Sequence, residues 1–186
     1  MSRKDQILHA ALRLFAARGY DRTPTSLIAK EAGVSSGLIF THFGDKEGLL
    51  AGIIQAGAAQ VAETMKPYAG EGDPLEAVLH HIRLSAELMQ AHAPFWRLVQ
   101  QLRFQPEVQH AAAGPIAAFQ ETVRTALTRQ FQRLGAAQPE LEALTLFALI
   151  DGMTVQYLQA PEQYPLLPLY EHLIQFYRRA YGVDRS

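Results

Sequence analysis

The sequence TPTSLIAKEAGVSSGLIFTHFGDKEGLL occupies residues 23–50 and predicts two short helices joined by a tight turn, with a third helix starting after them. Thr23 is a good N-cap for the first helix, because the proline after it suits the first helical position. Gly33 can adopt the left-handed backbone that ends a helix. Ser35 can then cap a second helix over residues 36–42. This is the layout of a helix-turn-helix, whose second helix enters the major groove of DNA.

The second helix presents hydroxyl groups, bare backbone and one apolar side chain in its first turns. Ser and Thr can hydrogen-bond to base edges or phosphates, and an apolar side chain can contact a thymine methyl group. Arg and Lys, the usual readers of guanine, are absent from this helix. We therefore expect few strong base contacts and more dependence on phosphates and DNA shape. The candidate contact residues are Ser35, Ser36, Gly37, Leu38 and Thr41.

This stretch, preceded by ILHAALRLFAARGYDRT, resembles the DNA-binding domain of the TetR (tetracycline repressor) family over residues 3–50. The elements IA..AGVS.G, aromatic-x-His-Phe and the following Lys all fall in register. The resemblance implies that Thr41, His42 and Lys46 contact the phosphate backbone. Phe40 stands where the family usually has Tyr, so one hydroxyl that can bind phosphate is missing. We add Thr23, at the start of the motif, and Phe40 to the DNA-binding candidates. The alternative is a three-helix packing unit without DNA contact.

Charge and composition are compatible with a DNA-binding head on an acidic body. Residues 1–50 hold seven Lys/Arg and five Asp/Glu, and residues 51–186 hold ten and thirteen, which makes +2 and −3. The chain has no cysteine, which excludes disulfides and Cys-based zinc sites and fits a reducing compartment. No apolar run approaches the length of a transmembrane helix and no secretory segment is evident. We expect a cytoplasmic protein without a membrane partner.

The sequence supports neither catalysis nor a cofactor. It contains no nucleophile elbow, no phosphate-binding loop and no paired carboxylates in an apolar setting. The seven histidines form no close His-x-x-x-His pair with a carboxylate, so we expect no metal site. We therefore predict that the protein is not an enzyme.

Helical periodicity continues to the end of the chain and predicts an all-α fold of about nine helices. Residues 1–50 form the predicted DNA-binding domain, and a long helix over about residues 45–66 connects it to an effector-binding and dimerisation domain over residues 51–186. Prolines suggest three further boundaries. We expect a brief helix ending at Ala113, a new helix over residues 116–134, and a last helix over residues 169–181.

Aromatic and polar residues gather on the middle helices of the body. The resemblance implies that a small ligand binds in a cavity among such helices; the alternative is a plain hydrophobic core. His92 and Asp151 are the most informative members, because a buried polar group needs a partner. The full candidate set is Met89, His92, Phe95, Trp96, Phe104, Phe119, Phe147, Asp151 and Tyr157.

The last two long helices carry more apolar side chains than one small domain needs to cover. The resemblance implies that they pair with a second copy across a two-fold axis as a four-helix bundle. Such a dimer sets two recognition helices about 34–36 Å apart, or a multiple of this, and predicts a palindromic operator in double-stranded DNA. The interface candidates are Leu144, Ala148, Gly152, Val155, Leu173, Phe176 and Tyr177.

Together these features suggest a homodimeric, ligand-responsive transcriptional repressor that a small hydrophobic or amphipathic ligand releases from its operator. A helical ligand-binding or interaction protein that has lost specific DNA binding is the alternative. The absence of Arg from the recognition helix, and Phe40 in place of Tyr, motivate this alternative.

Overall fold

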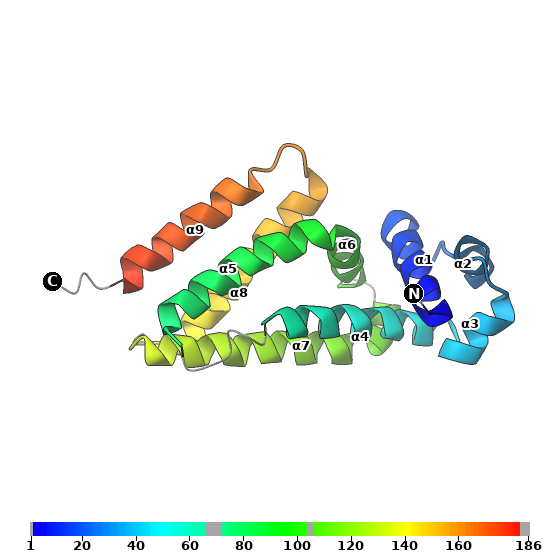
Figure 1. Ribbon diagram of the computed structural model, residues 1–186, viewed down its shortest axis with the longest axis horizontal. Helices are drawn as coiled ribbons and strands as arrows, with labels where there is room; N and C mark the ends of the chain where they lie inside the picture. Colours follow the sequence, from blue (N-terminus) through cyan, green and yellow to red (C-terminus); the bar gives the residue numbers. More distant parts are fainter. Residues whose placement is uncertain (1, 66–71, 104–105, 183–186) are drawn as a thin grey trace. The chain divides into compact units, whose positions relative to one another are not determined.

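The computed structural model describes residues 2–65, 72–103 and 106–182, and the regular structure in these ranges is helical (Figure 1). The prediction of an all-α fold with about nine helices is confirmed for the described residues. The helices are α1 Arg3–Arg18, α2 Thr25–Ala32, α3 Ser36–Phe43, α4 Lys46–Met65, α5 Pro74–Ala91, α6 Ala93–Leu102, α7 Pro106–Arg133, α8 Pro139–Gln159 and α9 Leu166–Tyr181.

Packing divides the chain into two compact units, each described here by itself. Unit 1 comprises Met1–Gln60 and Pro94–Ala118, and unit 2 comprises Val61–Ala93 and Phe119–Ser186. The helix-turn-helix therefore shares its unit with α6 and with the start of α7. This grouping by contacts does not follow the boundary that we predicted at residue 50, and the division of function there stays a prediction.

The core of unit 1 is apolar and draws on α1, α2, α3, α4 and α6. A tilted pair of rings, Phe15 and Tyr20, lies within it with 5.1 Å between the ring centroids. The Gln101 side-chain amide donates to the carbonyl oxygen of Ala16 over 3.2 Å, which joins α6 to α1. The largest fully buried side chains of this core are Phe15, Ile7, Ile28, Ile39, Leu49, Leu50, Ile54 and Leu98.

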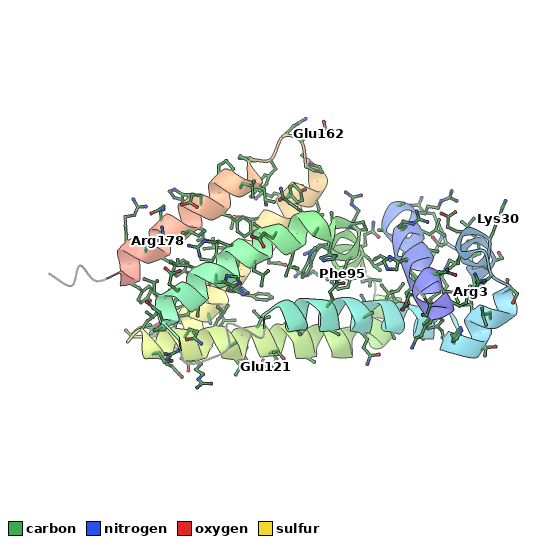
Figure 2. The ribbon with its side chains drawn as sticks, viewed as in Figure 1. Arg3, Lys30, Phe95, Glu121, Glu162 and Arg178 are labelled. Atoms are coloured by element: carbon green, nitrogen blue, oxygen red, sulfur yellow. The ribbon has the colours of Figure 1, made fainter. Side chains whose placement is uncertain are left out.

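Two glycines of α4 allow neighbouring side chains to approach its backbone. A Cβ atom at Gly52 would lie 3.2 Å from the Phe43 ring and 3.4 Å from Leu8. A Cβ atom at Gly57 would overlap the ring of Phe95, which α6 contributes (Figure 2). Because packed interiors have no spare volume, the absence of a side chain at Gly57 allows α6 to lie directly on α4.

Local signals set the start of α1, the end of α2 and the start of α3, and those at Gly33 and Ser35 were predicted from the sequence. Ser2 and Asp5 form a capping box, in which the Asp5 N–H donates to the Ser2 hydroxyl and the Ser2 N–H donates to the Asp5 carboxylate. Gly33 ends α2 with φ 64° and ψ 37°, in the left-handed region. Ser35 caps α3, where its hydroxyl accepts from the Leu38 N–H over 3.3 Å.

The prediction that Thr23 caps α2 is wrong. Pro24 occupies the N-cap position, where no side chain makes a capping hydrogen bond. The Thr23 side chain is fully buried, and its hydroxyl donates to the carbonyl oxygen of Gly19 over 2.8 Å. It therefore stabilises the turn that follows α1 and does not cap α2.

Unit 2 is centred on α5 and α9, which pack side by side. The buried stripe of α9 recurs at helical spacing and faces α5. At the other end of this stripe, Phe131 of α7 lies against Tyr177 and Tyr181, with 5.6 Å between ring centroids in both pairs. The buried residues of α9 are Leu166, Tyr170, Leu173, Ile174 and Tyr177.

Two helix boundaries predicted from prolines are wrong. One helix, α7, runs through Gly114 and Pro115, where we expected two. A proline removes one backbone hydrogen bond, and the rest of this 28-residue helix continues on both sides. Helix α9 begins at Leu166, three residues before the predicted start, and holds Pro168 in its first turn. An N–H at that position would have no partner within the helix.

Candidate nucleic-acid interface

The outward face of α3 consists of four residues that share one side of the helix. Ser36 and Phe40 are four residues apart, as are Gly37 and Thr41, and all four are exposed. Ile39, on the other side, is fully buried in the core of unit 1. The buried isoleucine fixes the rotation of α3, so the same four residues face outward as a set.

Most hydroxyl groups at this face are already engaged within the helix. The Thr41 hydroxyl donates to the carbonyl oxygen of Gly37 over 3.0 Å. Ser35 Oγ accepts the capping hydrogen bond from Leu38. Leu38 itself is half-buried and packs against the core, so it contributes less to the surface than predicted. The Ser36 hydroxyl is the remaining side-chain donor among Ser36, Gly37, Phe40 and Thr41.

Phe40 is the largest side chain on the outward face of α3, and 51% of its surface is exposed. The exposed part of the ring forgoes a favourable free energy, because burial of apolar surface contributes about 25 cal/mol per Å². The ring lies beside hydroxyl-bearing residues and bare backbone at Gly37. The role of this face in binding stays a prediction.

Lys46, at the start of α4, is held in place by aromatic and backbone groups. Its Nζ atom lies 4.2 Å from the centroid of the Tyr20 ring and 5.9 Å from that of Phe15. It also donates to the carbonyl oxygen of Asp21 over 3.4 Å. Burial lowers the pKa of Lys46, while nearby Asp21 acts in the opposite direction. Burial is also the main reason why the pKa of Tyr20 rises to about 12.

This arrangement places the Lys46 ammonium near the start of α4, where the Asp45 carboxylate accepts from the Gly48 N–H over 2.7 Å. The lysine cation, rather than the capped helix end, is the group there that favours a phosphate. Cation–π contact with Tyr20 restricts the long lysine side chain and reduces the entropy that binding would cost. Sequence reasoning identified Lys46 but missed its contact with Tyr20. An aromatic residue just after the end of α1 is expected to pack back on the domain, and this was the available signal.

Two predicted DNA-binding residues have contrasting positions. His42 is exposed, with its ring centroid 6.0 Å from that of Phe43, so it is available to a ligand. Thr23 is fully buried with its hydroxyl bound to Gly19, so its side chain does not reach the surface. We therefore remove Thr23 from the set of DNA-contacting candidates.

Further cations lie at the start of α1. The capping box places Arg3 and Lys4 in the first helical turn rather than in a free tail. The Lys4 Nζ atom lies 5.9 Å from the centroid of Phe43, at the end of α3. The Arg3 guanidinium donates to the Gln6 side chain over 3.0 Å and lies at the surface of unit 1 (Figure 2). These groups add positive charge near the recognition helix.

Comparison with known proteins identifies this architecture. The sequence profile of the family "Bacterial regulatory proteins, tetR family" matches residues 7–53. The HTH-type transcriptional repressor AcnR of Corynebacterium efficiens is 30% identical over 152 residues, which cover 80% of this chain and 78% of that repressor. The chain belongs to the TetR family. It is therefore a DNA-binding transcriptional regulator and not an enzyme, as predicted.

Solved structures of other proteins share the fold of this TetR-family chain. The regulator FadR from Bacillus subtilis, in complex with stearoyl-CoA, matches with a TM-score of 0.80 and 23% identity, covering 93% of this chain and 96% of FadR. A transcriptional regulator from Saccharomonospora viridis in complex with choline matches with a TM-score of 0.74 and 22% identity, covering 95% of each chain. At these identities the likeness concerns the fold alone.

The predicted ligand-binding residues of this TetR-family chain are divided between the two units. Phe95 and Trp96 belong to unit 1, where their rings meet edge to face with 5.2 Å between centroids. Phe95 is part of the hydrophobic core against α4, which is a structural role. Phe104 lies outside the described residues. The remaining candidates belong to unit 2: Met89, His92, Phe119, Phe147, Asp151 and Tyr157.

The unit 2 candidates differ in burial. Met89 is buried within α5, while the other five are half-buried. A shallow groove on α7 includes none of them; its lining is Glu121, Thr122, Thr125, Ala126, Arg129 and Gln130. Binding of a ligand by the unit 2 candidates stays a prediction.

The predicted interface residues fall into two classes. Leu144, Ala148, Gly152 and Phe176 are exposed, and Val155 is half-buried. Leu173 and Tyr177, in contrast, belong to the stripe of α9 that packs on α5, so they lie inside unit 2 and not on its surface.

The outer face of α8 is unusually apolar. Three exposed leucines lie along it: Leu141 at 55%, Leu144 at 45% and Leu149 at 44% exposure. Among the described residues, α8 is the one helix that length and composition would allow to cross a membrane, and 17% of its most apolar stretch is buried. Participation of this face in an interface stays a prediction.

Proposed function

We propose that this protein is a homodimeric repressor that binds a palindromic operator through α3 and is released by a small hydrophobic or amphipathic ligand. Residues 1–50 bind DNA, and residues 51–186 bind the ligand and a second copy of the chain. The exposed face of α3, on a helix-turn-helix of the TetR family, is the observation that carries the proposal.

Contacts with phosphate supply much of the affinity in this proposal. Lys46 is held at the start of α4 by Tyr20, and His42 is exposed in the last turn of α3. The outward face of α3 itself carries no charge, so backbone contacts must provide the electrostatic part of binding. A protein that works in this way binds more weakly as salt concentration rises.

The outer face of α8 supports the dimer. Its exposed leucines, together with Ala148 and Gly152, form an apolar surface on which a second helix can pack closely. Interfaces between identical chains are more apolar than the rest of a protein surface. A two-fold dimer also presents two copies of α3, which doubles the small contact surface of each recognition helix.

The ligand is proposed from the relatives and from the half-buried polar and aromatic residues of unit 2. One protein of this fold was crystallised with stearoyl-CoA and another with choline, so the fold does not select one ligand. A ligand releases the operator only to the extent that it binds the released form more tightly than the DNA-bound form. The chain crosses between the units within α4, α6 and α7, and α4, which follows α3 directly, is the covalent link from a ligand in unit 2 to α3.

Selection from random duplex DNA, followed by fluorescence anisotropy at several salt concentrations, tests DNA binding. We expect an enriched palindrome and an affinity that falls linearly with salt on logarithmic axes. Lys46→Ala should weaken binding about tenfold across sequences, because it removes one phosphate contact per subunit. Arg124→Ala, which removes a surface cation of α7, is the matched control and should leave affinity unchanged.

The ligand claim has a built-in probe, because the chain contains one tryptophan, Trp96. Titration with a long-chain acyl-CoA or with choline should change its fluorescence and lower operator affinity at the same ligand concentration. Fluorescence change without loss of operator affinity would contradict release by ligand. Sedimentation equilibrium measures the dimer directly, and a monomer at micromolar concentration would contradict the dimer.

A second candidate follows from the absence of Lys and Arg from α3. A helical ligand-binding protein that has lost specific DNA binding would retain the fold and bind its ligand. The same selection discriminates the two functions, because this protein would enrich no sequence while its fluorescence still responded to ligand.

A further inference from the structure

The recognition helix has little capacity for hydrogen bonds to base edges. Across Ser36–Phe43 there is no Lys, Arg, Asn or Gln, which are the side chains that form two hydrogen bonds with guanine or adenine. On the outward face the Thr41 hydroxyl already donates to Gly37, which has no side chain. The Ser36 hydroxyl is the donor that remains on this face, and apolar contact is the other means by which the face can read sequence.

The outward face does offer apolar surface. Phe40 is 51% exposed and lies between Ser36 and Gly37 around the helix. The bare backbone at Gly37 leaves room beside the ring, since a Cβ atom there would meet nothing closer than the Ser35 hydroxyl at 3.9 Å. A partner can therefore cover the ring without steric conflict from its neighbours on the helix.

The major groove presents one apolar group, the 5-methyl group of thymine, and the other base atoms at its floor are hydrogen-bond donors and acceptors. The phenyl ring of Phe40 cannot hydrogen-bond, and exposed next to polar DNA it gains free energy only where it covers apolar surface. Ile39 is buried behind α3, so the face of the helix that carries Phe40 is fixed before DNA binds. An apolar ring on that face favours thymine over cytosine and uracil wherever it covers the methyl group.

We propose that Phe40 is a specificity-determining residue that recognises thymine methyl groups in each half-site of the operator. This inference rests on the proposed function, because it requires α3 to enter the major groove. In this role Phe40 acts through its apolar ring, so the hydroxyl group of a tyrosine is not required. It also explains how a recognition helix without cationic or amide side chains reads sequence.

The test replaces single thymines by uracil in duplexes recovered by random selection, which removes one methyl group and leaves every hydrogen-bonding atom in place. For the unaltered protein, we expect one or two positions per half-site where uracil weakens binding about threefold to tenfold. This corresponds to the burial of one methyl group, about 0.8 kcal/mol or somewhat more. The other thymine positions should respond less than twofold.

Phe40→Ala should bind the selected duplexes more weakly and should lose the difference between thymine and uracil at those positions. Phe40→Tyr keeps the ring and should retain the difference. Leu167→Ala, which removes an equally exposed apolar side chain from α9, is the control and should bind as the unaltered protein does. Because Phe40 is half-exposed, its truncation should leave the unfolding temperature nearly unchanged, which thermal denaturation checks.

The outcomes separate this inference from the proposed function. A selected palindrome whose uracil derivatives bind equally well would overturn the role of Phe40 and leave the repressor intact. A thymine preference that survives Phe40→Ala would overturn it as well, and would assign the methyl contact to another group such as Thr41. Failure to select any sequence would overturn both proposals.

Discussion

The two units differ in the polar groups that they bury and in the apolar side chains that they expose. Among the described residues of unit 1, the Thr23 hydroxyl is fully buried and donates to the carbonyl oxygen of Gly19, while the buried Gln101 Oε1 atom has no hydrogen-bond partner. Unit 2 buries His81 and Tyr177, whose Nδ1 and Oη atoms have no hydrogen-bond partner among the described residues. It also exposes a row of leucines on α8. Both units therefore bury polar atoms without a partner, and the clearer difference is that unit 2 buries a titratable histidine and exposes the leucines of α8.

The largest test of this contrast is the pH dependence of unit 2. Burial, with His80 as a smaller cause, lowers the pKa of His81 from 6.5 to about 4. The unfolded chain binds a proton near pH 6.5 while the folded chain stays neutral until about pH 4. Between these two values the unfolded chain binds a proton that the folded chain does not. The free energy of unfolding is therefore highest above pH 6.5 and decreases as the pH falls to about 4. The loss should reach roughly 3 kcal/mol.

Urea denaturation between pH 7 and pH 4 measures this loss. His81→Leu should remove most of the pH dependence, because it replaces the titrating ring with an apolar side chain. His172→Gln changes an exposed histidine of α9 in the same unit and is the matched control. A pH slope that persists in His81→Leu would show that other groups of the chain are responsible.

The next test concerns the packing of unit 1. Gly57→Ala places a methyl group on the Phe95 ring, and overpacking of this kind costs about 1–3 kcal/mol. Gly114→Ala is the control within the same unit, because nothing lies within 4 Å of its added Cβ atom. That change should stabilise α7 by about 0.5–1 kcal/mol through helix propensity alone. Thermal unfolding of both variants compares them, and equal stability would contradict the close contact of α4 and α6.

These contrasts also explain which features the sequence could predict. The ends of α1, α2 and α3 depend on residues three or four positions apart, such as Ser2 with Asp5, and such signals can be read without tertiary structure. Pro115 misled the prediction of α7, because a single missing N–H does not end a helix that is long on both sides. Thr23 misled the prediction of the start of α2. Its hydroxyl can either accept from an N–H of the helix that follows or donate to a carbonyl of the turn before it, and in the structure it donates to Gly19.

The candidate sites beyond α3 depend on information that helical periodicity does not contain. Leu173 and Phe176 are both apolar residues of α9, yet α5 covers only Leu173. The pattern shows that a helix has apolar residues but not which neighbour covers them. Phe95 is a second example. Its ring is buried because Gly57, on α4, has no side chain, and the pattern of α6 alone does not contain this information.

The outer face of α8 can be tested at Gly152, where nothing lies within 4 Å of an added Cβ atom. In a single copy, Gly152→Ala should stabilise the exposed helix by about 0.5–1 kcal/mol. In the proposed dimer, the methyl group should obstruct a closely packed second copy and weaken dimerisation by about tenfold. Sedimentation equilibrium measures the second effect. Unchanged dimerisation would mean that the two copies do not meet at Gly152.

The smallest effect is expected at the surface of unit 1. Arg13 of α1 and Glu31 of α2 form an ion pair, with 2.7 Å between Nη2 and Oε1, and their side chains are 65% and 44% exposed. Exposed pairs of this kind contribute about 0–1 kcal/mol, and salt screens them. A double-mutant cycle with Arg13→Gln and Glu31→Gln should give a coupling below about 0.5 kcal/mol that vanishes in molar salt. A larger, salt-resistant coupling would mean that the surface, as well as the apolar core, holds α1 against α2.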